Sequence, residues 1–162
     1  MRPTITTILL LGSIGIAMPV QAETALLFFG ASHHMGCDQS RYRCDYREFN
    51  PGLGIELSRE TDSFGKVFAR IGSYSDSYGE QARLLTMGLR QDWELDNPAW
   101  RLGIGAMAGR LSGRRNETIG LPFLYIAHKQ LAIELGIAPT RVSKQNYKSK
   151  FIATLSIRWD LN

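Results

Sequence analysis

The stretch LAIELGIA at residues 131–138 decides the fold class of this chain. Branched apolar residues occupy its odd-numbered positions, and Glu134 and Gly136 lie between them. Apolar residues at every second position are typical of a β-strand, because successive side chains of a strand point to opposite faces. The stretch therefore predicts a strand with one apolar face and one face of polar and small residues.

The same alternation recurs along the chain after residue 22. No segment there carries an apolar stripe of helical period over three turns. The sequence predicts eight strands, at residues 24–34, 52–59, 66–74, 82–93, 99–111, 119–127, 130–138 and 149–160. The chain is therefore expected to be all-β and to form one domain.

The face opposite the apolar one carries most of the information. It holds charged residues and many glycines; the charged residues are Glu56, Arg70, Arg90, Glu134 and Arg158. In a membrane barrel the apolar face meets lipid and such charges pair inside the lumen. The even strand count and the alternation of short turns with longer loops favour an eight-stranded antiparallel up-and-down transmembrane β-barrel. A secreted β-sandwich, with the charged face in water, is the alternative.

The first 22 residues have the pattern of a secretory signal. Arg2 precedes an apolar run over residues 5–16, and the segment ends in Val20-Gln21-Ala22, a small-x-small site of the kind that signal peptidase cleaves. We expect residues 1–22 to be a signal peptide and residues 23–162 to be an outer-membrane barrel domain of Gram-negative type.

Export changes the interpretation of the two cysteines. Cys37 and Cys44 lie in one predicted loop, and a local disulfide is favoured there, because an oxidising compartment permits it. No metal site is expected, since only His33 and His34 lie nearby. The net charge of +4 is too small to indicate nucleic-acid binding.

Candidate chemistry gathers at the loop end of the predicted barrel. His33 and His34 end the first strand, and Asp76 and Ser77 lie in the loop after the third. A histidine can act as general base, a carboxylate can orient it and a hydroxyl can bind or attack the substrate, which is the minimum for acyl transfer. The two imidazoles would point to opposite faces of a strand, so one residue of register decides between them.

Several motifs in this order resemble the outer-membrane lipid A palmitoyltransferases of the PagP type. His34 precedes an aromatic and Pro-Gly-rich entry to the second strand, and Asp76, Ser77 and Tyr78 match an Asp-Ser-aromatic signature. Gly88 has the spacing of the glycine that forms the floor of that family's acyl pocket. The other matching segments are YREFNPGLGIE (46–56), LLTMGLRQDW (84–93), WRLGIGAMAG (100–109) and IGLPF (119–123).

The resemblance implies an acyltransferase that moves a palmitoyl chain from a glycerophospholipid to lipid A. It implies His34 as general base, Asp76 and Ser77 as the rest of the polar site, no cofactor, and a monomer in the outer membrane. The substrate-binding residues expected with it are Gly88, Arg114 and Arg115, the arginines on lipid A phosphates.

Alternatives follow from the same residues. The inward glycines indicate either room for a narrow acyl chain or relief of strand curvature. Pro51 and Pro139 lack a ladder donor, so they mark either lateral gaps for lipid entry or simple strand ends. A non-catalytic small barrel that binds lipid, adheres or supports the envelope predicts a charged lumen with no apolar pocket above Gly88. A lipid A deacylase is a third, weaker interpretation.

Overall fold

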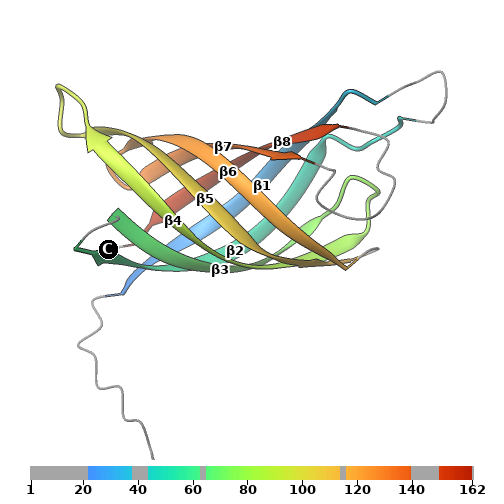
Figure 1. Cartoon of the computed structure of the whole chain (residues 1–162), viewed down its shortest axis with the longest axis horizontal. Coiled ribbons are helices and arrows are strands. Elements are labelled where there is room, and N and C mark those ends of the chain that lie inside the picture. Colours follow the sequence, from blue (N-terminus) through green and yellow to red (C-terminus); the bar gives the residue numbers. More distant parts are fainter. Residues whose placement is uncertain (1–21, 38–43, 63–64, 114–115, 140–149, 162) are drawn as a thin grey trace, which may run out of the picture.

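The computed structural model describes residues 22–37, 44–62, 65–113, 116–139 and 150–161. Over this part the chain is all-β, and its eight antiparallel strands close into one barrel in sequence order (Figure 1). The strands are β1 (Glu23–Met35), β2 (Phe49–Thr61), β3 (Gly65–Ser75), β4 (Gln81–Glu94), β5 (Trp100–Ser112), β6 (Glu117–His128), β7 (Leu131–Pro139) and β8 (Phe151–Asp160). Every predicted strand is present, and closure is made by β1 pairing with β8. The predicted signal peptide lies outside the described residues, apart from Ala22.

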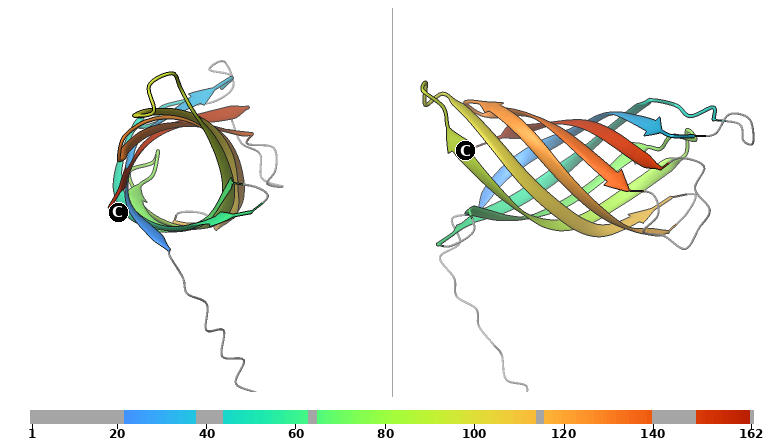
Figure 2. Two further views of the ribbon diagram at one scale, coloured as in Figure 1. Left: turned by 90° about the vertical axis from the view of Figure 1, so that its left-hand side faces the viewer. Right: turned by 45° about the horizontal axis from the view of Figure 1, so that its top comes forward.

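The two ends of the barrel differ in their connections. One end, called here the turn end, carries the β2–β3, β4–β5 and β6–β7 connections together with the start of β1 and the end of β8 (Figure 1). Its tightest turn is the two-residue link at Lys129 and Gln130, in which Lys129 has a positive φ of 53°. The other end, the loop end, carries the remaining four connections. Seen along its axis, the backbone forms an open ring (Figure 2).

The outer wall of the barrel is apolar. Leu53 and Met87 leave 64% and 71% of their surfaces exposed, and the other outward residues of these strands follow the same pattern. The further exposed aliphatic residues on the wall include Ile55, Leu57, Ile71, Leu85, Leu89, Leu102, Ile104, Leu124, Ile133, Leu135 and Ile157. Among the described residues, no helix is long and apolar enough to cross a membrane.

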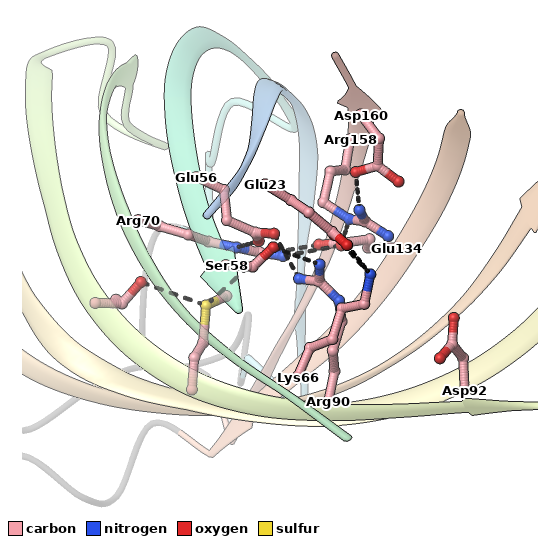
Figure 3. A network of polar contacts seen from close by, with 12 residues as sticks. Glu23, Glu56, Ser58, Lys66, Arg70, Arg90, Asp92, Glu134, Arg158 and Asp160 are labelled. Atoms are coloured by element: carbon pink, nitrogen blue, oxygen red, sulfur yellow. Dashed lines mark hydrogen bonds and ion pairs between the residues drawn. The ribbon is translucent and has the colours of Figure 1, made fainter. Parts of the chain in front are cut away.

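Charged side chains fill the lumen in its middle and toward the turn end (Figure 3). Arg70 donates from Nε to Glu56 at 2.6 Å and from Nη1 and Nη2 to Glu134 at 2.8 and 2.9 Å. Arg90 reaches the other oxygen of Glu56 at 2.5 Å, and Arg158 reaches Glu134 at 3.1 Å. All five side chains are buried, and Asp160 adds a third carboxylate that accepts from Arg158, so the three arginines meet three carboxylates.

Aromatic rings occupy the space that the inward glycines leave. A Cβ built on Gly88 would lie 2.4 Å from the Phe68 ring, and one on Gly103 would lie 2.2 Å from the Tyr125 ring. Phe68, Phe123 and Tyr125 form the buried apolar cluster of this region. These glycines therefore admit large rings next to the charge network, and they leave no empty channel at this level.

Removing one carboxylate from the network tests its energetic role. Glu56→Ala leaves Arg70 and Arg90 without a shared partner, and we expect the free energy of unfolding to fall by about 3–5 kcal/mol. Urea denaturation measures this. Glu60→Ala is the control, because the Glu60 side chain is 76% exposed and pairs with Lys66 at 3.7 Å, and we expect a loss of at most about 1 kcal/mol. Equal losses in the two variants would contradict the role given to the network.

Candidate functional site

A β-bulge in β1 decides which histidine faces the lumen. Phe29 pairs with Ser156 and Ala31 with Leu155, so Gly30 is an extra residue opposite β8. An extra residue inverts the facing of everything that follows it in the strand. His34 consequently points inward, opposite Ile152, whereas His33 points outward, where its Nδ1 contacts the exposed Glu48 at 2.5 Å.

The inward histidine meets the predicted serine. His34 Nε2 lies 2.8 Å from Ser77 Oγ, although 43 positions separate the two residues. Ser77 Oγ in turn lies 3.0 Å from Ser32 Oγ, and Ser32 donates to Asn50 Oδ1 at 2.6 Å. A continuous chain of polar atoms therefore runs from β1 through the β3–β4 loop to β2.

The number of hydrogens on the two serine hydroxyls determines which group donates in each of these hydrogen bonds. A hydroxyl has one hydrogen, and Ser32 uses its own on Asn50, whose amide is oriented by a bond from Nδ2 to the Arg47 carbonyl oxygen at 3.4 Å. Ser77 must then donate to Ser32 and accept from His34 Nε2. In this resting arrangement Nε2 carries a hydrogen, and His34 can act as a base at that atom only after the hydrogen has moved.

Two tyrosines cover the histidine from the loop end. The Tyr46 ring stacks on the His34 ring with centroids 3.8 Å apart and planes within 11°, and Tyr78 meets Tyr46 edge-on at 5.9 Å. Tyr46 also donates its backbone N–H to the carbonyl of Cys44, which forms the predicted disulfide with Cys37. The disulfide thus anchors the segment that holds Tyr46 over the imidazole.

Asp76 holds the β3–β4 loop in shape, and its predicted part in the polar site stays a prediction. Its Oδ1 accepts the backbone N–H groups of Tyr78 at 2.9 Å and Glu80 at 2.8 Å, an Asx-type turn. Among the described residues the Asp76 carboxylate makes no hydrogen bond to His34. Asp76 therefore shapes the loop that presents Ser77, and the aromatic ring of Tyr46 orients the imidazole.

A cavity of about 250 Å³ lies directly below these groups. His34, Ser32, Asn50, Asp76 and Ser77 line its mouth, and its wall is mainly apolar. The apolar wall residues include Phe29, Leu84, Leu111, Ile119, Leu121 and Ile152. Arg70 and Met107 also line it, so the charge network closes the cavity toward the turn end.

Gly88, expected at the floor of an acyl pocket, does not line this cavity. The Phe68 ring packs against Gly88, and the cavity ends nearer the mouth, at Leu84, Arg70 and Met107. Arg114 and Arg115, expected to bind lipid phosphates, lie outside the described residues.

The cavity reaches a break in the wall between β6 and β7. Pairing of these strands ends at Phe123 with Gly136, although both strands continue toward the loop end. Pro122 follows on β6 without an N–H to donate, and Pro139 ends β7. Residues 117–121 of β6 line the cavity beside Ala138 and Pro139 of β7, so the cavity meets the barrel wall where no ladder joins it.

Several residues of the site were not identified from sequence. Ser32, Asn50 and Tyr46 are ordinary polar and aromatic residues, and only the bulge at Gly30 turns the face of β1 that carries Ser32 and His34 toward the lumen. Pro122 had a detectable signal, because a proline inside an alternating run marks an interruption of the ladder.

In the described part of the chain, no three or more His, Cys, Asp or Glu side chains are grouped in a way that could hold a metal ion. No protein-family model matches the sequence, and no curated protein matches it.

Tyr46 is expected to shield and orient His34. Replacing it by Ala removes the stacked ring, so carbethoxylation of His34 by diethyl pyrocarbonate should accelerate severalfold, whereas Tyr46→Phe should preserve the slow rate. Peptide mass spectrometry reads both histidines, and the exposed His33 is the internal control. An unchanged rate at His34 in Tyr46→Ala would show that the ring does not cover the imidazole.

Proposed function

We propose that the protein is an outer-membrane acyltransferase that moves a palmitoyl-type chain from a glycerophospholipid to lipid A. The observation that carries the proposal is the joining of the His34–Ser77 pair to a blind apolar cavity inside a barrel. A polar pair at the mouth and apolar walls beneath it suit an ester whose carbonyl stays at the mouth while its chain is buried.

The outer wall supports a membrane location. Soluble monomers rarely expose a continuous apolar surface, and here the charges lie inside while the aliphatic side chains lie outside. Trp93, Trp100 and Trp159 are all exposed near the turn end, in the manner of an aromatic girdle at a bilayer interface. These features favour a transmembrane barrel over the secreted sandwich.

The cavity depth suits an acyl chain. Phe29 and His34 lie opposite Ser156 and Ile152, so the ladder advances four positions between them; at about 3.3 Å per position and a tilt of about 40° this gives a depth of about 10 Å. Half of a bilayer's hydrocarbon core, the depth of one leaflet's chains, is about 15 Å. Most of a membrane acyl chain therefore fits above Arg70 and Met107, and the ester lies near Ser77.

The unpaired segment between β6 and β7 gives such a chain a route. A phospholipid in the surrounding leaflet can pass its chain sideways through the wall, because no ladder hydrogen bonds have to break there. Pro51 and Pro139 were predicted as markers of lateral gaps. Pro139 lies at this break, and Pro51 lies in β2 just beyond Gly52, where the pairing of β2 with β3 ends.

In the proposed reaction the acceptor hydroxyl of lipid A attacks the donor ester. A new ester bond forms to the acyl carbon, the bond to the glycerol oxygen breaks, and His34 passes the proton from the acceptor to the leaving glycerol oxygen. Ser77, 2.8 Å from the imidazole, is within reach of the same substrate oxygens. Nε2 can accept this proton when the single hydrogen of the neutral imidazole is on Nδ1. Substrate binding at Ser77 permits this tautomer, because it replaces the hydrogen bond between Nε2–H and Ser77 Oγ.

The rival function is a non-catalytic lipid-binding barrel, and the charge network favours it. That interpretation expected a charged lumen without an apolar pocket; the structure combines the network with a pocket on its loop-end side. An activity measurement separates the two functions.

The direct test incubates purified protein in detergent with phospholipid carrying a labelled sn-1 palmitoyl chain and with lipid A. We expect labelled lipid A, and we expect His34→Ala to lower the rate by about 100-fold or more. Ser77→Ala should also transfer the labelled chain more slowly than the wild type does. His33→Ala is the matched control and should keep its activity, because His33 faces outward. Transfer by neither wild type nor control, with the barrel folded by circular dichroism, would refute the enzyme.

Occluding the cavity provides a second test. Ala138 faces the lumen and lines the cavity, so Ala138→Phe should shift the preference toward shorter acyl donors. Ile137→Phe on the outward face of the same strand should leave the chain-length profile unchanged. A donor series from 8 to about 16 carbons measures the profile, which spans chains up to roughly one leaflet in depth. The same profile in both variants would mean that the chain does not occupy this cavity.

A further inference from the structure

The outer wall changes character near the loop end of β3, β4 and β5. Across these strands Ser73 pairs with Arg83, and Arg83 pairs with Ser112, so three outward polar residues form one row. In the next row toward the turn end, Ile71 pairs with Leu85, and Leu85 pairs with Arg110. This boundary is where the apolar wall ends on this side of the barrel.

Arg83 and Arg110 are diagonal neighbours across β4 and β5, a separation that long side chains bridge. Both are exposed. Neither forms an ion pair with any described residue, in contrast to the lumen arginines Arg70, Arg90 and Arg158, each of which has a carboxylate partner. Two like charges held side by side without an acid between them are unfavourable in the absence of an anion.

A groove on the outer wall leads to this pair. Its volume is about 880 Å³, and Arg83 and Arg110 line it together with Ser73, Gln81 and Ser112. The remaining side chains that face it are apolar, including Leu26, Phe28, Leu53, Ile55, Ile71 and Leu85. The groove is thus apolar along most of its surface and cationic at its loop end.

We propose that this groove binds a phosphate-bearing membrane lipid, with the phosphate between Arg83 and Arg110 and an acyl chain along Ile71 and Leu85. Guanidinium groups bind phosphate oxygens through paired, charge-assisted hydrogen bonds. Gln81 and Ser112 supply neutral donors next to the phosphate. Ser73 positions Gln81, because its hydroxyl donates to the Ala82 carbonyl oxygen at 3.1 Å and accepts from Gln81 Nε2 at 3.2 Å. One ligand therefore matches the whole groove: its phosphate matches the cationic end, and its acyl chain matches the apolar length.

This site is separate from the acyl cavity, because outward and inward residues of one strand lie on opposite sides of the wall. Arg83 faces out, whereas its neighbours Ala82 and Leu84 are buried and line the cavity. The lipid site rests on the membrane location given under the proposed function, but it does not require that the protein is an enzyme. A His34→Ala variant should therefore bind the lipid as the wild type does, and that result distinguishes failure of the enzyme from failure of this site.

The test titrates the full-length folded protein in detergent with phosphatidic acid and with diacylglycerol of the same chains, read by native mass spectrometry. The two lipids differ only in the phosphate. We expect wild type to retain phosphatidic acid in preference to diacylglycerol, and we expect Arg83→Ala/Arg110→Ala to weaken phosphatidic acid binding by roughly tenfold or more. Arg59→Ala, an outward arginine near the turn end of β2, is the matched control and should bind as wild type does.

Three outcomes would overturn the proposal. The first is equal binding of the two lipids by the wild type, and the second is unchanged phosphatidic acid binding by the double variant. The third is displacement of the bound lipid by millimolar inorganic phosphate, which would identify the pair as a site for the free anion. Retention of phosphatidic acid against inorganic phosphate supports the lipid as ligand.

Discussion

The rest of the structure depends on the compensation of Arg70 by Glu56 and Glu134 across the lumen. A guanidinium buried in this position has a large desolvation penalty, and the carboxylates on β2 and β7 offset it together with the Phe68 and Phe123 rings, whose centroids lie 4.5 and 5.3 Å from it. The network therefore joins strands on different sides of the barrel. It also divides the interior, because aromatic rings and ion pairs fill the region toward the turn end and an apolar cavity remains toward the loop end. A narrow barrel whose lumen is filled along its whole length has no room for a ligand. One whose lumen is empty along its whole length has no closed end to a cavity.

The chemistry at the mouth of the cavity depends on one irregularity in β1. Without the extra residue at Gly30, the strand would turn Ser32 and His34 to the outside and Ala31 and His33 to the lumen. With it, β1, β2 and the β3–β4 loop contribute to one chain of polar groups, and the disulfide-anchored Tyr46 covers the imidazole. The break between β6 and β7 opens the wall beside the same cavity. Imidazole, hydroxyl, cavity and opening are thus gathered at one end, which is the arrangement that the proposed transfer from a membrane ester requires.

The fold was predictable because its signal is distributed over the whole chain. Each strand repeats the same period of two, as in residues 131–138. The charged residues share one face, and closure of the barrel places that face inside, where the charges pair. The His34–Ser77 contact was predicted as a pair, yet the choice of His34 over His33 was open, because a bulge changes facing without changing composition. The orienting role expected for Asp76 was not separable from turn formation in sequence, since both use the same carboxylate. The packing of Phe68 onto Gly88 depends on cross-strand register, which a single sequence does not specify.

The most direct measurement of the central claim is an experimental structure of the protein with a bound diacyl phospholipid or its non-hydrolysable ether analogue. The account predicts an acyl chain inside the barrel, ending above Arg70 and Met107, with the first carbons of the chain beside His34 and Ser77 and the glycerol at the break between β6 and β7. Continuous density for the lipid only on the outer wall, with water filling the cavity, would contradict it.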